Sequence, residues 1–531
     1  MPSLTATSAN QSSRATGNLK WKVFLTLAAT FLMLVFFGPT DNDAWDSSFY
    51  YAQLRSPIID HDLNLRGETD TGGFTLAYTA TGLQGSAYPL GPGLLWSPFF
   101  LTAHLITRIF LPAQADGYSF LYISLVTLGS ALFGVVALYL IYRACRFFAG
   151  RRLAFLTVCL CLFASPLFFF MFRQPIMSHT TNLFASAGLL LVYLFLDENR
   201  DLERWSGLLF GVFLGLCFLT RWSGLILAIL PLLYFGSRLF SAFRSKKSLD
   251  VQSVLLQALA MAAVFLVVIS PQLVFWYRLH RSLLVFPPAR SDFLANLLPL
   301  NFFSIFTHTN RGLPYWFPFS LLGMLGFFFI PDLKLKLAAF LYVFLLTFLL
   351  GYRKDWYGGG IFGARYYIEA LPFLAFGFVS MTRRVFQAPA GKAFLISLAI
   401  LLAAHQLMLM QAVEHAAEPG WVNLEKYLRG KPLGLRWQLE ASLHLLKEPA
   451  VLLSPRPYVG LDRQTVLANL LHGERYLQNY LIPGFAVLLT TFVILAIIAL
   501  ARRAHRAHLL PVALGLLALM LTWAVYLSLL A

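Results

Sequence analysis

Long apolar segments alternate with short polar segments along most of this chain. A helix needs about 20 apolar residues to cross a bilayer, and the apolar segments predict about thirteen crossings, within a range of 11 to 14. The predicted spans are residues 21–39, 118–142, 153–171, 179–196, 206–220, 222–236, 253–275, 312–331, 336–352, 366–382, 392–412, 480–501 and 509–530. The pattern therefore predicts an all-α, polytopic membrane protein.

Composition supports a membrane protein and excludes a soluble globular enzyme. Hydrophobic residues make up 58% of the chain and charged residues 12%, whereas about 45–50% and about 25% are ordinary in soluble proteins. The net charge of +17 does not indicate a nucleic-acid partner, because the basic residues gather in short loops, as in Arg143/Arg146/Arg151/Arg152, Arg238/Arg244/Lys246/Lys247, Arg383/Arg384 and Arg502/Arg503/Arg506. Such clusters are typical of cytoplasmic loops. No spacing of cysteine or histidine indicates a disulfide or a metal site.

The basic clusters also predict the orientation of the chain. The N-terminus is predicted to be cytoplasmic, with residues 1–20 disordered and the first span acting as an uncleaved signal anchor. Residues 90–112 are apolar too, but a crossing there would move Arg143–Arg152 to the outside, so we expect short helices along the outer interface. Three polar regions then share the outer face: 40–117, 276–311 and 353–365.

The same pattern divides the chain into parts. Residues 21–412 are predicted to form the main transmembrane module, which includes the first outer loop. Residues 413–479 have mixed charges and several aromatic residues, which indicate a small folded domain on the outer face, and residues 480–531 form a C-terminal transmembrane hairpin. No internal repeat is evident, which argues against a transporter built from inverted repeats.

The first outer loop inverts the charge of the chain. It carries Asp41, Asp43, Asp46, Asp60, Asp62, Glu68 and Asp70 against only Arg55 and Arg66. Asp43 and Asp46 follow the first span directly, so a carboxylate there lies at the membrane surface, where it can accept a proton from an acceptor hydroxyl. Two alternatives stay open. In the first, these acids are solvated loop residues or one of them caps a helix at Ser47–Leu54. In the second, Asp41, Asp43 and Asp46 together ligate Mg²⁺ or Mn²⁺, which prefer carboxylate oxygens.

Basic residues predicted on the same face can hold a phosphate-linked leaving group, on whose oxygens charge builds as the bond breaks. They are Arg173, His179, Arg311, Arg353, Lys354 and Arg365. For each, a place on the loop surface is the alternative. Arg365 stands out because nearby glycines, among them Gly363, allow tight turns and close approach to a ligand. Arg221 separates two short apolar halves and is either a turn at the outer surface or a buried charge that needs a partner.

Several motifs, taken in order, resemble a known family. The stretches DSSFYYAQLRS from Asp46, DHDLNL from Asp60 and YPLGPGLLWSPF from Tyr88 resemble the first outer loop of bacterial GT-C glycosyltransferases. This is the family related to protein O-mannosyltransferases and to the lipid A aminoarabinose transferases. Further matches lie at Met177–His179, at Leu219–Trp222 and from Trp356 through Arg365 to Pro372, so that the resemblance runs through most of residues 20–385.

The resemblance implies a GT-C type helical bundle and an inverting transferase that moves a hexosyl or pentosyl group from polyprenyl phosphate. An Asp at the start of the first outer loop is the base in that family, and Asp46 matches best, with Asp43 as the alternative. Ser47 stands where the family often has Glu, so a mechanism with two carboxylates is not implied. The remaining roles are donor-phosphate binding by Arg365, His179, Lys354, Tyr366 and Arg311, and acceptor or sugar binding by Tyr50, Asp62, Tyr88 and Trp356.

The resemblance also implies partners and a location. The donor is a polyprenyl-phosphate sugar, the acceptor is a hydroxyl of lipopolysaccharide, another cell-envelope glycan or a protein, and the site faces the periplasm from the bacterial inner membrane. No cofactor is expected apart from the Mg²⁺ or Mn²⁺ alternative. Two other functions stay open: a flippase for lipid-linked saccharides, which the near absence of charge within the spans disfavours, and a polymerase or ligase with its site in a later loop such as 413–479.

Overall fold

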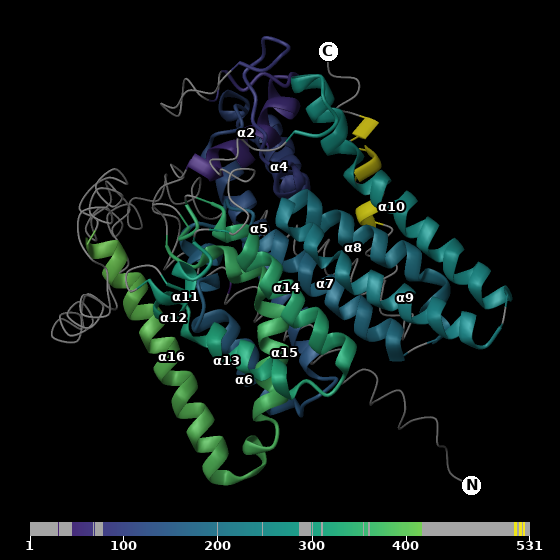
Figure 1. Ribbon diagram of the computed structural model, residues 1–531. Helices are drawn as coiled ribbons and strands as arrows, with labels where there is room; N and C mark the ends of the chain where they lie inside the picture. The colour runs from purple at the N-terminus through teal and green to yellow at the C-terminus, as the bar shows by residue number, and fades with distance from the viewer. Residues whose placement is uncertain are drawn as a thin grey trace, which may run out of the picture.

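The computed structural model is built almost entirely of helices (Figure 1). It describes residues 30, 45–66, 68, 78–198, 200–246, 248–285, 299, 301–308, 312–353, 355–358, 362–416, 515–517, 520–522, 524 and 525. Within these residues the β-structure is a single bridge between Tyr78 and Gln84. The predicted class, an all-helical polytopic membrane protein, is confirmed by the helices of this described part and by their apolar character.

The helices follow one another closely along the chain. The α-helices are α2 (Trp45–Ile59), α4 (Gly91–Phe110), α5 (Phe120–Cys145), α6 (Arg151–Phe163), α7 (His179–Glu198), α8 (Ser206–Thr220), α9 (Ile229–Arg244), α10 (Ser248–His280), α11 (Ser304–Thr307), α12 (Leu313–Trp316), α13 (Pro318–Gly326), α14 (Leu333–Gly351), α15 (Leu371–Thr382) and α16 (Pro389–Ala416). A π-helical turn, η2, covers Phe169–Arg173. The 3-10 helices are η1 (Pro112–Gln114), η3 (Arg200–Trp205), η4 (Trp222–Ala228), η5 (Phe327–Phe329), η6 (Arg365–Ala370) and η7 (Val385–Gln387).

Eight helices in the described part are long and apolar enough to cross a membrane. They are Gly91–Phe110, Leu121–Cys145, His179–Glu198, Leu202–Thr220, Trp222–Arg244, Leu249–His280, Leu333–Gly351 and Pro389–Met410. Seven of them coincide with predicted spans. The eighth, α4, is the segment placed along the outer interface, and since length and composition would also let it cross, its position at the interface stays a prediction.

The core is arranged around α7. This helix is buried over 94% of its apolar window and lies between α5 and α8. On the other side of α8, three glycines four residues apart, Gly207, Gly211 and Gly215, face α10, and a Cβ at any of them would lie 2.5 to 2.7 Å from an atom of α10. Small residues let helix backbones approach closely in membranes. The spacing therefore explains why α8 and α10 pack tightly along their lengths.

A second close contact holds the segment that precedes α15. A Cβ on Gly326 of α13 would lie 2.1 Å from the backbone of Gly377 in α15, and one on Gly323 would lie 2.7 Å from Leu374. The two helices therefore pack backbone to backbone. This contact fixes α15, and with it η6, whose residues Arg365–Ala370 continue directly into α15.

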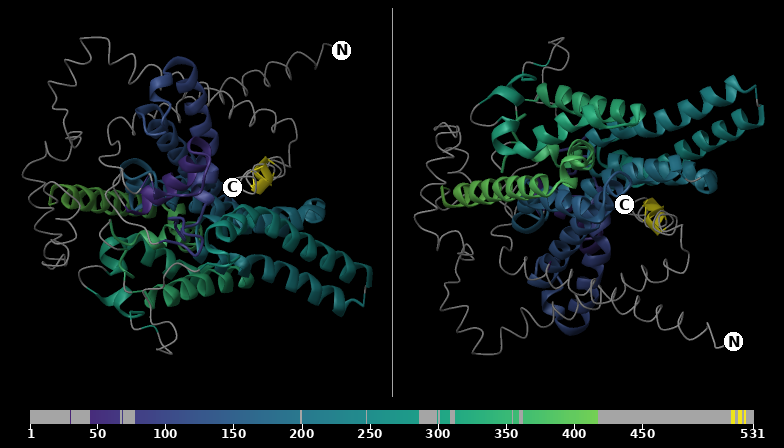
Figure 2. Two further views of the ribbon diagram at one scale, coloured as in Figure 1. Left: turned by 90° about the horizontal axis from the view of Figure 1, so that it is seen from above. Right: turned by 90° about the horizontal axis from the view of Figure 1, so that it is seen from below.

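Contacts join the described parts of the three regions predicted to share the outer face. The Thr81 hydroxyl donates to the Leu279 carbonyl at 2.9 Å, which links the first loop to the end of α10. Asn301 donates from its backbone to Gly351 at 3.1 Å and from its side chain to the carbonyl of Arg353 at 3.2 Å. In Figure 1 the helices α2 and α4 lie together with one end of α10. Figure 2 shows α10 and α16 extending from the core in opposite directions.

Two predicted spans are interrupted. Residues 153–171 form α6 only as far as Phe163, and the chain then breaks before the π-helical turn, because Pro166 cannot continue the backbone hydrogen bonds of α6. Residues 312–331 divide into α12, α13 and η5, since Pro314 lies in the first turn of α12 and Pro318 begins α13. Of the first span only Thr30 is described, and residues 417–514 lie outside the described residues, so the proposed division into domains stays a prediction.

Candidate active site

Asp46 lies in the first turn of α2 and contacts a residue that is distant in the sequence. Its Oδ2 accepts a hydrogen bond from Nη1 of Arg365 at 2.8 Å, across 319 positions of sequence. Its Oδ1 accepts one from the hydroxyl of Tyr88 at 2.7 Å. The Arg365 side chain is 7% exposed and that of Asp46 is 21% exposed. A partly accessible carboxylate is thus held in one orientation by two donors.

The backbone before Arg365 explains how this residue reaches Asp46. Gly358 has a φ of +98°, which favours glycine, and Ala364 has a φ of 59°. A Cβ on Gly363 would lie 2.7 Å from the ring of Trp316, so only glycine lets the loop pass this close to α12. The glycines around this segment therefore allow the tight turns that the sequence predicted, and they deliver Arg365 to the start of η6.

Two tyrosines line the same region. The ring of Tyr88 stacks on Phe49 at 5.1 Å and meets the ring of Tyr50 edge-on at 5.4 Å. The Tyr50 hydroxyl donates to Ser178 at 3.2 Å. Burial raises the pKa of the Tyr50 phenol to about 12, and the nearby Asp46 carboxylate acts in the same direction. Burial likewise raises the pKa of Tyr88, so both hydroxyls stay protonated and act as donors.

Three guanidinium groups surround the ring of Tyr366. The central carbons of Arg221, Arg353 and Arg365 lie 5.0, 5.3 and 5.2 Å from the ring centroid. A cation within about 6 Å of an aromatic face is attracted by the ring quadrupole. Positively charged side chains from three separate segments of the chain therefore lie around the ring of Tyr366.

Each of these arginines is paired with a carboxylate. Arg365 contacts Asp46, as described above. Arg353 donates two hydrogen bonds of 2.8 Å to Asp355, whose Oδ2 also accepts one from the Tyr366 hydroxyl at 3.1 Å. Nε of Arg221 lies 3.8 Å from Oε2 of Glu369. Each arginine of this cluster therefore has a negatively charged partner within it.

Asp355 is a fixed counter-ion rather than a base. Burial alone would raise the pKa of its carboxyl group, but the hydrogen bonds and the charge of Arg353 outweigh this effect and hold the pKa below its usual range. The ionised form of Asp355 is thereby favoured. Of the other two carboxylates in the cluster, Glu369 is 2% exposed and Asp46 is 21% exposed, so Asp46 is the one that a bound molecule can reach.

His179 begins α7 and meets Arg221. Nδ1 of the histidine lies 3.2 Å from Nη1 of Arg221, and the histidine ring packs against Phe170 at 4.3 Å. Arg221 ends α8 and directs its side chain into the cluster. The two interpretations that the sequence left open for this residue thus both apply: it lies at a turn, and it has a buried partner, Glu369.

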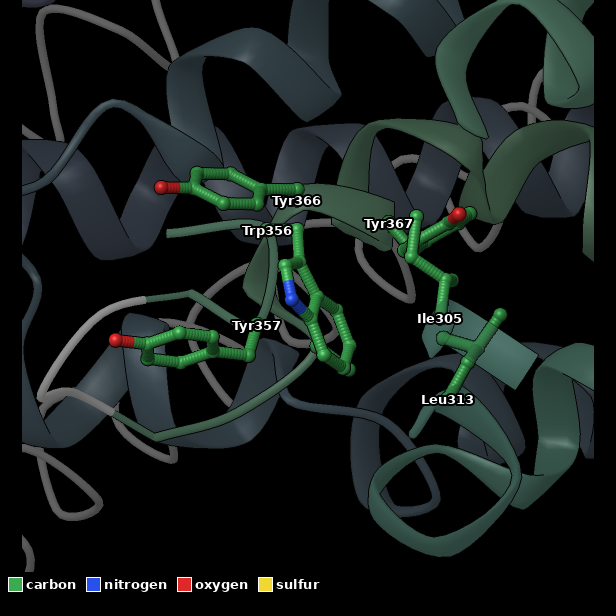
Figure 3. A pocket seen from close by; sticks show the side chains of 7 residues that line it. Ile305, Leu313, Trp356, Tyr357, Tyr366 and Tyr367 are labelled. Atoms are coloured by element: carbon green, nitrogen blue, oxygen red, sulfur yellow. The ribbon is translucent and has the colours of Figure 1, made fainter. Parts of the chain in front are cut away.

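A small aromatic pocket adjoins the arginine cluster (Figure 3). It is lined by Ile305, Leu313, Trp356, Tyr357, Ala364, Tyr366 and Tyr367. Figure 3 shows Trp356 between Tyr357 and Tyr366, with Ile305 and Leu313 across the pocket. Trp356, a predicted sugar-binding residue, therefore lies beside Tyr366, a predicted phosphate-binding residue.

The structure brings some of the predicted residues together and leaves others apart. Asp46, Arg365, Tyr366, Tyr88, Tyr50, His179 and Trp356 lie in or beside the cluster. Asp62 instead holds the turn after α2, where Oδ1 accepts from the Ser56 hydroxyl at 2.8 Å and from the backbone of Asn64 at 3.0 Å. Asp43, Lys354 and Arg311 lie outside the described residues.

Sequence reasoning missed three members of the cluster as site residues: Arg221, Asp355 and Glu369. Two of them carried a usable signal, because Arg221 and Glu369 are charges at the ends of predicted spans, where an ionisable residue is costly without a function. Asp355 carried none, since an acid in a polar loop is ordinary.

The proposed cation site cannot be placed as a whole, because Asp41 and Asp43 lie outside the described residues. In the part of the chain that the structure covers, no group of three or more His, Cys, Asp or Glu residues is arranged to hold a metal ion. The third predicted ligand, Asp46, has both carboxylate oxygens in hydrogen bonds with Arg365 and Tyr88.

Comparisons with known proteins agree with the resemblance for part of the chain. Residues 122–276 match the family described as dolichyl-phosphate-mannose-protein mannosyltransferase. This stretch runs from α5 to α10 and includes His179 and Arg221, so this part of the chain is similar to a family of membrane glycosyltransferases. No curated protein matches the chain.

Two solved structures are similar at low identity. The oligosaccharyltransferase of Archaeoglobus fulgidus is 13% identical, with a TM-score of 0.41, over 76% of this chain and 56% of that one. ArnT from Cupriavidus metallidurans is 15% identical, with a TM-score of 0.37, over 84% of this chain and 78% of that one. The chain thus spans just over half the length of the archaeal protein.

Proposed function

We propose that this protein is an inverting glycosyltransferase with a GT-C type bundle, which moves a sugar from polyprenyl phosphate to a hydroxyl of a cell-envelope acceptor. The observation that carries the proposal is the contact between Asp46 and Arg365, because it joins a base and a leaving-group cation at one point. The arginine cluster around Tyr366 and the family match over residues 122–276 support the same activity.

In the proposed reaction Asp46 takes the proton of the acceptor hydroxyl. The freed oxygen attacks the anomeric carbon from the side opposite the phosphate, and the bond between that carbon and the phosphate oxygen breaks. A singly charged phosphodiester becomes a phosphate monoester that carries about two negative charges. The negative charge that Asp46 loses therefore appears on the phosphate.

Arg365 suits this movement of charge. Its guanidinium group pairs with Asp46 in the structure and offers further N–H groups, of which Nε is buried with no hydrogen-bond partner in the described part of the chain. When Asp46 becomes neutral, the phosphate becomes the better partner for Arg365. The arginine thus stabilises both the reactant and the product without moving far, which is the condition for electrostatic preorganisation.

Other residues of the region complete the proposed site. His179 and Tyr366, together with Lys354 and Arg311, contact the donor phosphate. Tyr50, Tyr88 and Trp356 contact the sugar or the acceptor, whereas Asp62 holds the turn after α2. Trp356 is the residue best placed for stacking on a sugar, because it lies in the aromatic pocket next to Tyr366.

The proposed location is the periplasmic face of a bacterial inner membrane. The polyprenyl tail stays in the bilayer and the phosphate lies at its surface, so the reaction must take place at the interface. The acceptor is a lipopolysaccharide, another envelope glycan or a protein. The proposal needs no cofactor; the Mg²⁺ or Mn²⁺ alternative involving Asp41, Asp43 and Asp46 remains to be tested by metal removal.

The test compares the purified wild type with Asp46→Asn in detergent and bacterial lipid. Release of free polyprenyl phosphate is measured from a panel of polyprenyl-phosphate sugars, with crude cell-envelope extract as acceptor. We expect release by the wild type and a loss of about 100- to 10,000-fold in Asp46→Asn, the range of general-base contributions. Asp60→Asn is the matched control, because Asp60 follows the other end of α2 and is exposed.

Two outcomes would contradict the proposal. Full activity of Asp46→Asn at normal expression would remove Asp46 as the base. A lipid-linked sugar that binds both proteins equally and is never turned over would favour a flippase instead.

A further inference from the structure

Glu369, Arg221 and His179 form a buried line of contacts beside the arginine cluster. Glu369 accepts a hydrogen bond from the Ser223 hydroxyl at 3.1 Å, and its Oε2 lies 3.8 Å from Nε of Arg221. Nη1 of Arg221 lies 3.2 Å from Nδ1 of His179. Glu369 is 2% exposed and His179 is 3% exposed. The Arg221 side chain is 17% exposed, so this ion pair is largely shielded from water.

The backbone holds Arg221 at this point. Its amide donates to the Cys217 carbonyl at 3.1 Å, which closes the last turn of α8, and its carbonyl accepts from Gly224 at 2.9 Å. A Cβ on Gly224 would lie 2.2 Å from the Cys217 carbonyl oxygen, so the turn requires glycine there. Arg221 therefore leaves the end of α8 in a fixed direction, toward His179 and Glu369.

The contact with Arg221 determines which nitrogen of His179 carries a proton. A guanidinium group only donates hydrogen bonds, so Nδ1 must be the acceptor and must carry a lone pair. The proton of the ring is then on Nε2, and the ring is neutral. A doubly protonated ring would place an N–H group against the N–H groups of Arg221 in a buried site, which is unfavourable.

The resulting Nε2–H group is a hydrogen-bond donor that can bind a ligand oxygen. Nε2 of His179 is buried and has no hydrogen-bond partner within the described ranges. The other ring nitrogen contacts the guanidinium group of Arg221. A buried N–H group without a partner is costly to retain, and one in a ring beside a cation suits an anionic oxygen.

We propose that Glu369 and Arg221 are positioning residues, which fix His179 as a neutral Nε2–H donor to an oxygen of the lipid-linked phosphate. This inference rests on the proposed function for the identity of the anion. His179 transfers no proton in this role. Its hydrogen bond strengthens as the phosphate oxygen gains charge during the reaction, while a neutral ring avoids adding another positive charge to the cluster.

The first test reads the tautomer directly and needs no activity. The full-length protein is labelled with ¹⁵N-histidine, and nitrogen chemical shifts are recorded in detergent at neutral pH, with His179→Gln identifying the signal. We expect a ring protonated on Nε2 only. In the double variant Arg221→Met/Glu369→Met, which removes both buried charges together, we expect a mixture of tautomers. A ring protonated on Nδ1 in the wild type would overturn the proposal.

The second test uses polyprenyl phosphate, the product of the proposed reaction, as the probe. Its addition should shift the Nε2 signal of His179 in the wild type, and no shift at saturating probe would overturn the donor role. A shift in a protein that never transfers sugar would uphold the phosphate contact while removing the proposed function. The two failures are therefore distinguishable.

A third test asks for rescue by a conservative variant. The amide nitrogen of Gln reaches about as far as Nε2 of histidine, whereas that of Asn reaches only as far as Nδ1. We expect His179→Gln to keep at least about tenfold more kcat than His179→Asn, with similar KM, because the lost bond strengthens only as the reaction proceeds. Equal activity of the two variants would indicate a merely structural histidine and would overturn the proposal.

Discussion

Oδ2 of Asp46 lies 2.8 Å from Nη1 of Arg365, so an ion pair joins the first loop to the segment before α15. The contact joins two parts of the chain that the sequence marked separately, one for its acids and one for its glycines and arginine. In the proposed reaction negative charge moves from Asp46 to the phosphate, and Arg365 contacts both groups, so the first prediction concerns Arg365.

Replacing Arg365 with lysine should lower kcat by about 10- to 100-fold. Lysine keeps the charge but loses the flat array of donors that can contact Asp46 and a phosphate together. Steady-state release of polyprenyl phosphate measures the effect. Arg244→Lys, in the last turn of α9 and outside the cluster, is the control. An Arg365→Lys enzyme with wild-type kcat would mean that charge alone suffices at this position.

Stability should fall between about pH 4.5 and about pH 7 because of Glu68. Burial raises the pKa of this carboxyl group to about 7, against the opposing effect of Arg55. The folded protein therefore binds a proton more tightly than the unfolded chain. The stabilisation is full below the pKa of Glu68 in the unfolded chain, and it is lost as pH rises through the pKa of Glu68 in the folded protein.

Thermal unfolding in detergent across this pH range measures the effect of Glu68. The Glu68→Gln variant should lose the decline between about pH 4.5 and about pH 7, because an amide does not titrate. Parallel curves for the two proteins would show that Glu68 does not control this dependence.

Adding a methyl group between α13 and α15 should destabilise the protein. In Gly326→Ala the new Cβ would lie 2.1 Å from the backbone of Gly377, and overpacking of this kind costs about 1–3 kcal/mol. Transfer activity should fall as well, since α15 carries η6 and Arg365. Gly236→Ala in α9 is the control, because its Cβ would meet nothing within 4 Å. Equal melting temperatures of the two variants would contradict the close packing of α13 on α15.

Removal of divalent cations should leave the transfer activity intact. Both oxygens of Asp46 already have donors, Arg365 and Tyr88, and arginines supply the positive charge that a leaving phosphate needs. The measurement is polyprenyl phosphate release after treatment with EDTA. If activity disappears and returns on addition of Mg²⁺ or Mn²⁺, the alternative with Asp41, Asp43 and Asp46 as cation ligands is correct.

Hydropathy was enough to predict most of the helices. Seven of the eight long apolar helices lie where the sequence placed spans, because the need to bury about 20 apolar residues in lipid is local and leaves a clear trace. The interruptions at Pro166 and Pro318 were visible as prolines, yet the sequence could not say whether a proline breaks a helix or only bends it.

The sequence by itself determined the helical membrane class and the candidates Asp46 and Arg365, since hydropathy, charge and motifs are properties of short segments. Only the tertiary structure decided that these two residues meet, that three arginines surround Tyr366, and that Arg221 joins Glu369 to His179. The physical reason is that each partnership is a contact between segments distant in sequence. It depends on the packing of α8, α13 and α15, and no local pattern encodes that packing.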